Sequence, residues 1–184
     1  TANTIDDLTP VFNNSHAINM LNAKYVIYNP EVPPLINNRA LGNAWFAQKV
    51  KFAANANEEL SSINSLNPSS EAVVDVIFRD FVEKSDYPSD AGDTIFLVSY
   101  QPNELVYRCS SSGERLAVFS EIYYPAGWKS FIDGKESPHF RANYVLRAMI
   151  VPEGKHEISF RFQPDSYIKG NKVSLASSVL LLLI

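Results

Sequence analysis

The feature that most constrains the fold is a succession of short apolar segments, separated by turn residues, between residues 72 and 162. Apolar and polar side chains alternate in segments 105–109 and 158–162. A period of two is typical of a strand with one buried and one solvated face. Asp133-Gly134 is a two-residue hairpin signal, because a type I′ turn needs positive φ at both central positions. The pattern therefore predicts antiparallel β-structure.

Seven segments are predicted as strands in this part of the chain: 72–78, 95–100, 105–109, 116–122, 128–132, 144–151 and 158–162. Short strands at this spacing, joined by Gly, Pro, Asn and Asp turns, favour a sandwich of two sheets. An aromatic content of 12% fits such strands. We predict a mainly β fold, an antiparallel β-sandwich of jelly-roll-like or Ig-like type.

The first 70 residues have a different, mixed pattern. A weak helical pattern covers residues 5–22, and strands are expected at 25–28 and 45–52. A short helix is expected to begin at Asn57 as its N-cap, followed by acidic residues that suit the first turn. We therefore expect a small mixed α/β appendage over 1–70, packed on a sandwich over 71–172.

The last segment, 173–184, carries no charge and ends in a run of leucines. A spanning helix needs about 20 apolar residues, and this run is shorter. One interpretation is a buried terminal strand or core helix. The other, which the uninterrupted leucine run favours, is the start of a truncated transmembrane helix. By the positive-inside rule, Lys169 and Lys172 just before it give a small, two-charge bias towards a cytoplasmic flank, which conflicts with an extracytoplasmic position for the preceding domain.

Composition excludes some classes of partner. The chain has 184 residues, a formal net charge of -4 and no basic stripe, so we expect no nucleic-acid partner. Cys109 is the only cysteine, which rules out an intrachain disulfide. Its place in the alternating segment 105–109 predicts that it is a small buried hydrophobe.

No metal or cofactor site is expected from the sequence. His16, His139 and His156 are scattered and lack metal-ligand spacing. A loop with three aspartates also lacks the spacing and terminal Glu of a calcium loop, so solvated acids are the expectation there. These aspartates are Asp86, Asp90 and Asp93.

A catalytic site is not expected either. The chain contains no Gly-x-Ser-x-Gly elbow. Glycoside hydrolysis needs two carboxylates that face each other across the scissile bond. Glu121, Asp133 and Glu136 are near one another in sequence, but no pattern indicates that they converge.

The best candidate for ligand binding is the aromatic segment 123–128. Tyr123, Tyr124 and Trp128 could stack on the apolar faces of sugar rings, while Glu121 and Lys129 could bind hydroxyl groups. The proline and glycine within the segment would hold the rings on a rigid bend. The alternative is that Trp128 and one tyrosine anchor the core of the sandwich, as large aromatic residues commonly do.

Four segments in order carry a resemblance to a known family: 21–27, 42–46, 119–135 with its Tyr-Tyr-Pro-Ala-Gly-Trp-Lys run, and 151–156. Together they resemble the C-terminal region of YfhO-like bacterial membrane proteins, especially the Bacteroidetes type. The resemblance implies a parent with many transmembrane helices and large extracytoplasmic parts, similar to membrane glycosyltransferases that use lipid-linked sugar donors. In such enzymes the catalytic acids lie near the first helices, a region absent here, so no catalytic residue is carried over.

Two functions follow as hypotheses. The first is a non-catalytic accessory domain on the periplasmic or extracytoplasmic side of the inner membrane. Its partners would be the transmembrane part of the same polypeptide and a cell-envelope glycan. The second is a purely structural or protein-interaction module with no glycan affinity. A stand-alone hydrolase ranks last.

Overall fold

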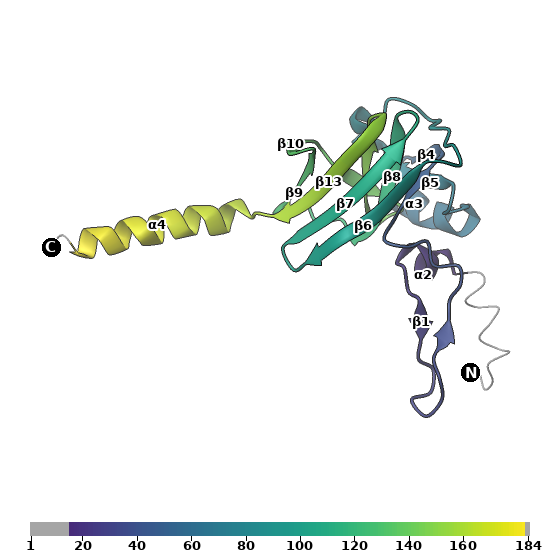
Figure 1. The fold of residues 1–184 in the computed structure, drawn as a ribbon, viewed down its shortest axis with the longest axis horizontal. Coiled ribbons are helices and arrows are strands. Elements are labelled where there is room, and N and C mark those ends of the chain that lie inside the picture. Colours follow the sequence, from purple (N-terminus) through teal and green to yellow (C-terminus); the bar gives the residue numbers. More distant parts are fainter. Residues whose placement is uncertain (1–14, 183–184) are drawn as a thin grey trace.

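The alternating segments form two facing antiparallel sheets in the computed structural model, which describes residues 15–182 (Figure 1). The five-stranded sheet has the order β10 (Lys135–Glu136), β9 (Trp128–Ile132), β13 (Gly154–Phe162), β7 (Glu104–Ser111) and β6 (Thr94–Gln101). The four-stranded sheet has the order β11 (Phe140–Ala142), β12 (Leu146–Val151), β8 (Arg115–Ile122) and β3 (Ala44–Ala47). The predicted mainly β fold with antiparallel sheets is confirmed.

The core between the two sheets is built from the alternating residues. Leu105, Tyr107 and Cys109 of β7 are all buried there, as the period of two predicted. Tyr107, Phe119 and Phe160 form an edge-to-face trio whose ring centroids lie 4.8, 4.9 and 6.1 Å apart. Such edge-to-face pairs stabilise beyond the area they bury, so this trio fixes the spacing of the sheets.

A third layer covers the other face of the four-stranded sheet. It consists of β4 (Lys49–Ala53), paired in parallel with β5 (Glu71–Asp75), and the connecting helices α3 (Ala56–Ser62) and η1 (Ile63–Ser65). Strand β8 is consequently buried on both faces. The strand predicted over 72–78 ends at Asp75, where the chain enters the 3₁₀ helix η2 (Val76–Phe81). The Asp75 side chain accepts the N–H of Ile77 and so caps that helix.

Helix α3 begins earlier than predicted. Its N-cap is Asn55 and not Asn57, because the Asn55 side chain accepts the N–H groups of Asn57 and Glu58, both at 3.1 Å. Glu59 on this helix is fully buried and accepts hydrogen bonds from Arg141 and from the N–H of Tyr144, both at 2.8 Å. The Glu59 carboxylate therefore connects α3 to Arg141 of β11 and to the turn that follows this strand.

The first 70 residues contribute to the sandwich itself as well as to an arm. The predicted strand 45–52 is divided at Gln48 into β3 and β4, which belong to different sheets. Before them, α2 (His16–Met20) packs on the body through the buried Met20, while β1 (Tyr25–Val26) and β2 (Leu35–Ile36) form an arm that projects from it (Figure 1). The first part of the helical pattern expected over 5–22 lies outside the described residues.

Two predicted turns are present, with different roles. Asp133 and Gly134 have φ values of 51° and 77° and connect β9 to β10, so the predicted hairpin is confirmed. Residues 152–154 instead carry the chain from β12 in the four-stranded sheet to β13 in the five-stranded sheet. The strand predicted over 144–151 begins two residues late, because Asn143 and Tyr144 both have positive φ.

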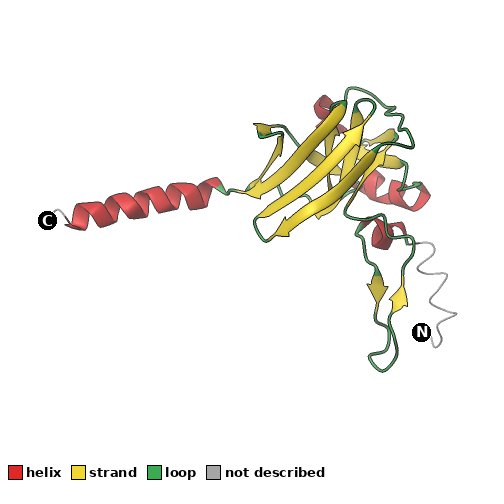
Figure 2. Cartoon of the chain, in the orientation of Figure 1, coloured by secondary structure: helices red, strands yellow, loops and turns green. Residues whose placement is uncertain are grey.

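The end of the chain is a helix, α4 (Asp165–Leu182), that leaves the end of β13 and projects from the sandwich (Figure 2). Its side chains from 171 to 179 are all exposed, including Leu175 at 68%. The interpretation as a buried strand or core helix is therefore wrong for the described part of the segment. Within residues 15–182, no helix combines the length and apolarity that a membrane crossing requires.

Candidate functional site

A pocket of about 570 Å³ lies where α4 leaves the sandwich. It is formed by the turn that leads into β9, by the end of β13 and by the first residues after it. Its lining residues are Tyr124, Pro125, Ala126, Gly127, Trp128, Lys129, Phe162, Gln163, Pro164 and Ser166. Aromatic rings and hydrogen-bonding groups thus converge at one end of the molecule.

The turn before β9 is locked against the end of β13. Gly127 has a φ of 124°, and a Cβ at this position would lie 2.8 Å from the ring of Phe162, so only glycine fits. The Gly127 N–H donates to the carbonyl of Pro125 at 3.1 Å, and its carbonyl accepts the N–H of Gln163 at 2.6 Å. The rigid bend predicted for this segment is therefore present, and it is part of the pocket wall.

Tyr124 and Trp128 both line this pocket, and Trp128 also packs against the core between the two sheets. Tyr124 is 52% exposed, whereas Trp128 is half-buried and packs on Phe162 at 5.4 Å between ring centroids. Lys129 also lines the pocket, and no hydrogen bond or ion pair engages its ammonium group within the described structure. Gln163 and Ser166 add further hydrogen-bonding capacity.

Behind Trp128 lies a buried guanidinium. Arg147 of β12 is 2% exposed, and its Cζ lies 4.2 Å from the centroid of the Trp128 ring and 5.2 Å from that of Phe160. Its Nε donates to the carbonyl of Ile122 at 3.0 Å, while Nη1 has no hydrogen-bond partner among the described residues. This geometry is a desolvated cation–π contact.

Glu121, predicted to bind hydroxyl groups, does not line the pocket. It is half-buried at the end of β8, where burial raises the pKa of its carboxyl and the positive charge of Arg147 opposes that rise. Burial of His139, and then the positive charge of Arg147, lower the pKa of this histidine to about 4, so it is neutral at pH 7. Glu121 and Arg147 therefore influence each other electrostatically behind the pocket wall.

Tyr123 also lies outside the pocket lining. Its ring packs edge-on against Phe78 at 5.7 Å and against His139 at 5.6 Å, and its N–H donates to Val145. Of the five predicted glycan-binding residues, the structure thus brings Tyr124, Trp128 and Lys129 to one pocket and places Tyr123 and Glu121 elsewhere.

Sequence reasoning missed Phe162, Gln163 and Arg147. A signal existed for two of them. Phe162 continues the apolar alternation of Ile158 and Phe160, which predicts its side of the sheet. Arg147 interrupts an otherwise apolar run over 144–151, and a charge in a buried strand requires a special partner.

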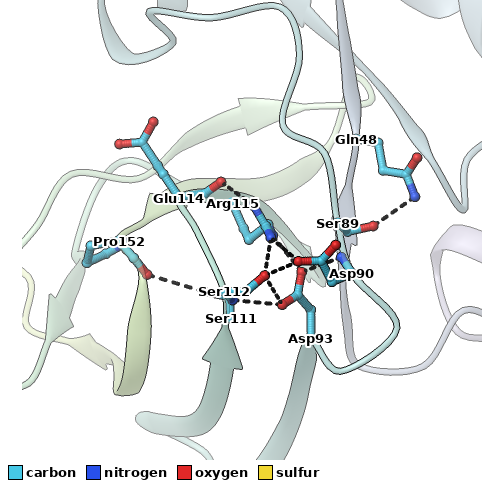
Figure 3. Close-up of polar contacts among 9 residues, drawn as sticks. All are labelled: Gln48, Ser89, Asp90, Asp93, Ser111, Ser112, Glu114, Arg115 and Pro152. Atoms are coloured by element: carbon cyan, nitrogen blue, oxygen red, sulfur yellow. Dashed lines mark hydrogen bonds and ion pairs between the residues drawn. The ribbon is translucent and has the colours of Figure 1, made fainter.

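A second polar cluster holds the loop before β6 (Figure 3). The Nε of Arg115 donates to Asp93 at 2.6 Å, and the side chains of both residues are nearly fully buried. Ser112 donates from its N–H to Asp93 at 2.9 Å and from its hydroxyl to Asp90. The expectation of solvated loop acids is therefore wrong for Asp93, which is the counter-ion of a buried arginine.

The other acidic and histidine candidates take part in hydrogen bonds and ion pairs. Asp133 accepts hydrogen bonds from the N–H of Glu157 at 2.9 Å and from His156 Nδ1 at 2.6 Å, and these bonds lower its pKa. It lines a pocket of about 600 Å³ with Asp80 and Glu114. Glu114 in the same pocket forms an ion pair with Lys84 at 2.7 Å. Among residues 15–182, no three His, Cys, Asp or Glu side chains cluster as metal ligands.

In comparisons with known proteins, no family model, no curated protein and no solved structure matches the chain.

Proposed function

We propose that this chain is a non-catalytic accessory domain that binds a cell-envelope glycan in the pocket at the α4 end of the sandwich. The observation that carries the proposal is the convergence of Tyr124 and Trp128 on one pocket that also contains Lys129. Aromatic side chains supply apolar faces for the C–H groups of a sugar ring, and the adjacent polar groups can bind its hydroxyl groups. The rigid Gly127 turn keeps this surface preformed, which lowers the entropic cost of binding.

We further propose that the domain lies on the extracytoplasmic side of a multi-span membrane protein, as the resemblance to YfhO-like proteins implies. The support from the fold is helix α4. Val173, Leu175 and Val179 are exposed along it, and a helix with aliphatic side chains normally buries them. Lipid, or the transmembrane part of the same polypeptide, would provide that burial and would bring the pocket close to the membrane surface.

Titration of the domain with a panel of envelope oligosaccharides, followed by tryptophan fluorescence, tests the glycan pocket. We expect a saturable response from the native chain and a weakening of about tenfold for Tyr124→Ala, equivalent to about 1.4 kcal/mol of binding free energy. Trp128→Phe should weaken binding as well and should also lose most of the fluorescence response.

The matched control is Tyr25→Ala, which removes another exposed tyrosine, 65% exposed against 52% for Tyr124, from the projecting arm. It should leave the affinity unchanged. A panel that gives no saturable response, or an affinity unaffected by Tyr124→Ala, would remove the glycan proposal.

A second candidate function is a structural or protein-interaction module. The observation in its favour is the arm, where Tyr25, Ile27 and Ile36 are each at least 65% exposed. Apolar side chains on a projecting two-stranded ribbon are typical of a surface that another protein covers. A native chain that binds no oligosaccharide in the titration would leave this alternative as the better account.

A further inference from the structure

Arg147 differs from the other strongly buried arginine, Arg115, in how its charge is compensated. Arg115 forms an ion pair with Asp93 at 2.6 Å. Arg147 has no carboxylate within ion-pair distance among the described residues, and its guanidinium lies against the rings of Trp128 and Phe160 instead. Burying a cation without a direct counter-ion is costly, so such an arrangement is unexpected for a purely structural residue.

Trp128 packs against the core between the sheets, and two neighbours make specific contacts with its ring. Phe162 contacts it at a tilt of 53°, and the Arg147 guanidinium covers the ring at 4.2 Å. Arg147 is itself fixed, because its Nε donates to the carbonyl of Ile122 at 3.0 Å. The half-buried indole is therefore anchored to strand β8 through Arg147 and to strand β13 through Phe162.

We propose that Arg147 is the positioning residue of the pocket: it holds the Trp128 ring for stacking on a sugar, and Glu121 serves as its distant counter-ion and not as a glycan contact. The ring-positioning part concerns the free protein, whereas its effect on affinity rests on the glycan-binding function proposed above. The planar guanidinium suits this role better than an ammonium, because it can stack on the indole while one edge donates to a carbonyl.

The experiment uses the chain labelled with 5-fluorotryptophan and observed by ¹⁹F NMR. The protein contains two tryptophans, and Trp128→Phe assigns the two signals. Trp45 is buried in the other core, on the far face of the four-stranded sheet, and so provides an internal reference. Arg147→Met, which keeps an unbranched apolar side chain without the charge, should shift or broaden the Trp128 signal and leave that of Trp45 in place.

The matched control is Arg79→Met. Arg79 also lies over an aromatic ring, that of Phe52, at 4.7 Å, but it is exposed and far from the pocket lining. This variant should leave the Trp128 signal and the oligosaccharide affinity unchanged. Arg147→Met should weaken binding about tenfold, because the Trp128 ring loses the contact that orients it for stacking. Arg147→Lys should restore part of both the signal position and the affinity.

The positioning role of Arg147 and the glycan-binding function are contradicted by different results. A folded Arg147→Met protein with a native Trp128 signal would overturn the positioning role, even if the native chain binds oligosaccharide. If Arg147→Met does not fold, Arg147→Lys carries the test, since an unmoved Trp128 signal there contradicts the need for a guanidinium. Absence of binding by the native chain would instead overturn the glycan function.

Glu121→Gln tests separately whether Glu121 contacts the glycan. Because Glu121 does not line the pocket, this variant should keep the oligosaccharide affinity within about twofold of the native value. A loss as large as that of Trp128→Phe would make Glu121 a glycan contact and contradict the assignment.

Discussion

At the scale of single residues, three arginines that are buried or partly buried make different kinds of contact. Arg115 pairs with one buried carboxylate, and Arg141 contacts Glu59 at 2.8 Å and Asp75 at 3.3 Å. Arg147 is surrounded by aromatic rings. The first two arrangements hold loops and helices on the sandwich, whereas the third lies directly behind the pocket. The ion-paired arginines therefore have a structural role, and the positioning role proposed for Arg147 rests on its different surroundings.

The Asp93–Arg115 pair predicts a specific acid sensitivity. Burial alone would raise the pKa of Asp93, but hydrogen bonds from the N–H groups of Asp90 and Ser112, and then from Arg115, lower it from 3.8 to about 2. A lowered pKa means that the carboxylate stabilises the fold fully above pH 3.8 and that this contribution is lost as the pH falls towards 2.

We therefore expect Asp93→Asn to lower the free energy of unfolding at pH 7 by about 2–4 kcal/mol, because it leaves Arg115 buried without its counter-ion. Urea unfolding at pH 7 and at pH 3 measures this. The difference between the native and Asp93→Asn proteins should shrink at the lower pH. An exposed carboxylate, Glu83, provides the control through Glu83→Gln. A difference that is independent of pH would contradict the account of the pair.

The sequence predicted only part of the candidate site. The alternation of β8 suggests that Phe119, Glu121 and Tyr123 share a face, but the strand ends at Ile122. Beyond that point the chain turns, so Tyr124 reaches the pocket and Tyr123 packs against Phe78. The residue types therefore predicted a cluster of aromatic side chains. Which tyrosine reaches the pocket depends on where β8 ends, and no residue in the sequence signals that end.

At the scale of elements, periodicity predicted the strands but not their partners. Segments 105–109 and 158–162 alternate strictly, and both are central strands of the five-stranded sheet. The segment 72–78 is apolar except for Asp75, and such a run does not reveal that only its first part extends in parallel beside β4. Which strands pair depends on how whole faces of the sheets pack together. A local sequence pattern carries no information about strands that are far apart in the chain.

The Gly127 turn is the element on which the pocket depends most. Gly127→Ala would place a Cβ 2.8 Å from the Phe162 ring at a φ that L-residues rarely adopt, so it should lower the free energy of unfolding by about 1–3 kcal/mol. Thermal unfolding followed by circular dichroism measures this loss. Gly92→Ala is the control, since a Cβ there meets nothing within 4 Å. Equal melting temperatures for both variants would contradict the locked turn.

At the scale of the whole molecule, two segments project from the sandwich. The arm of β1 and β2 and the helix α4 extend in different directions (Figure 1). Both expose apolar side chains that the sandwich does not cover. The leucine run led to a helix being expected at the end of the chain. In the arm, only a strand over 25–28 was expected, because strands of two residues carry almost no periodic signal.

The membrane placement predicts that α4 confers affinity for lipid. In flotation with vesicles of phosphatidylethanolamine and phosphatidylglycerol, the native chain should float with the lipid. Leu175→Asp should reduce the floating fraction, because a carboxylate enters lipid at high cost. Phe96→Asp changes a residue of similar exposure on β6 and should leave flotation unchanged. Equal flotation of the two variants would contradict a role for α4 at the membrane.

The most direct test of the central claim, a glycan pocket at the α4 end of the sandwich, is amide chemical-shift mapping of the native chain during titration with an envelope oligosaccharide that it binds. The account predicts that the largest shifts fall in residues 124–129 and 162–166, around the pocket. Shifts centred on the pocket of Asp80, Glu114 and Asp133, or no shifts with any member of the panel, would contradict it.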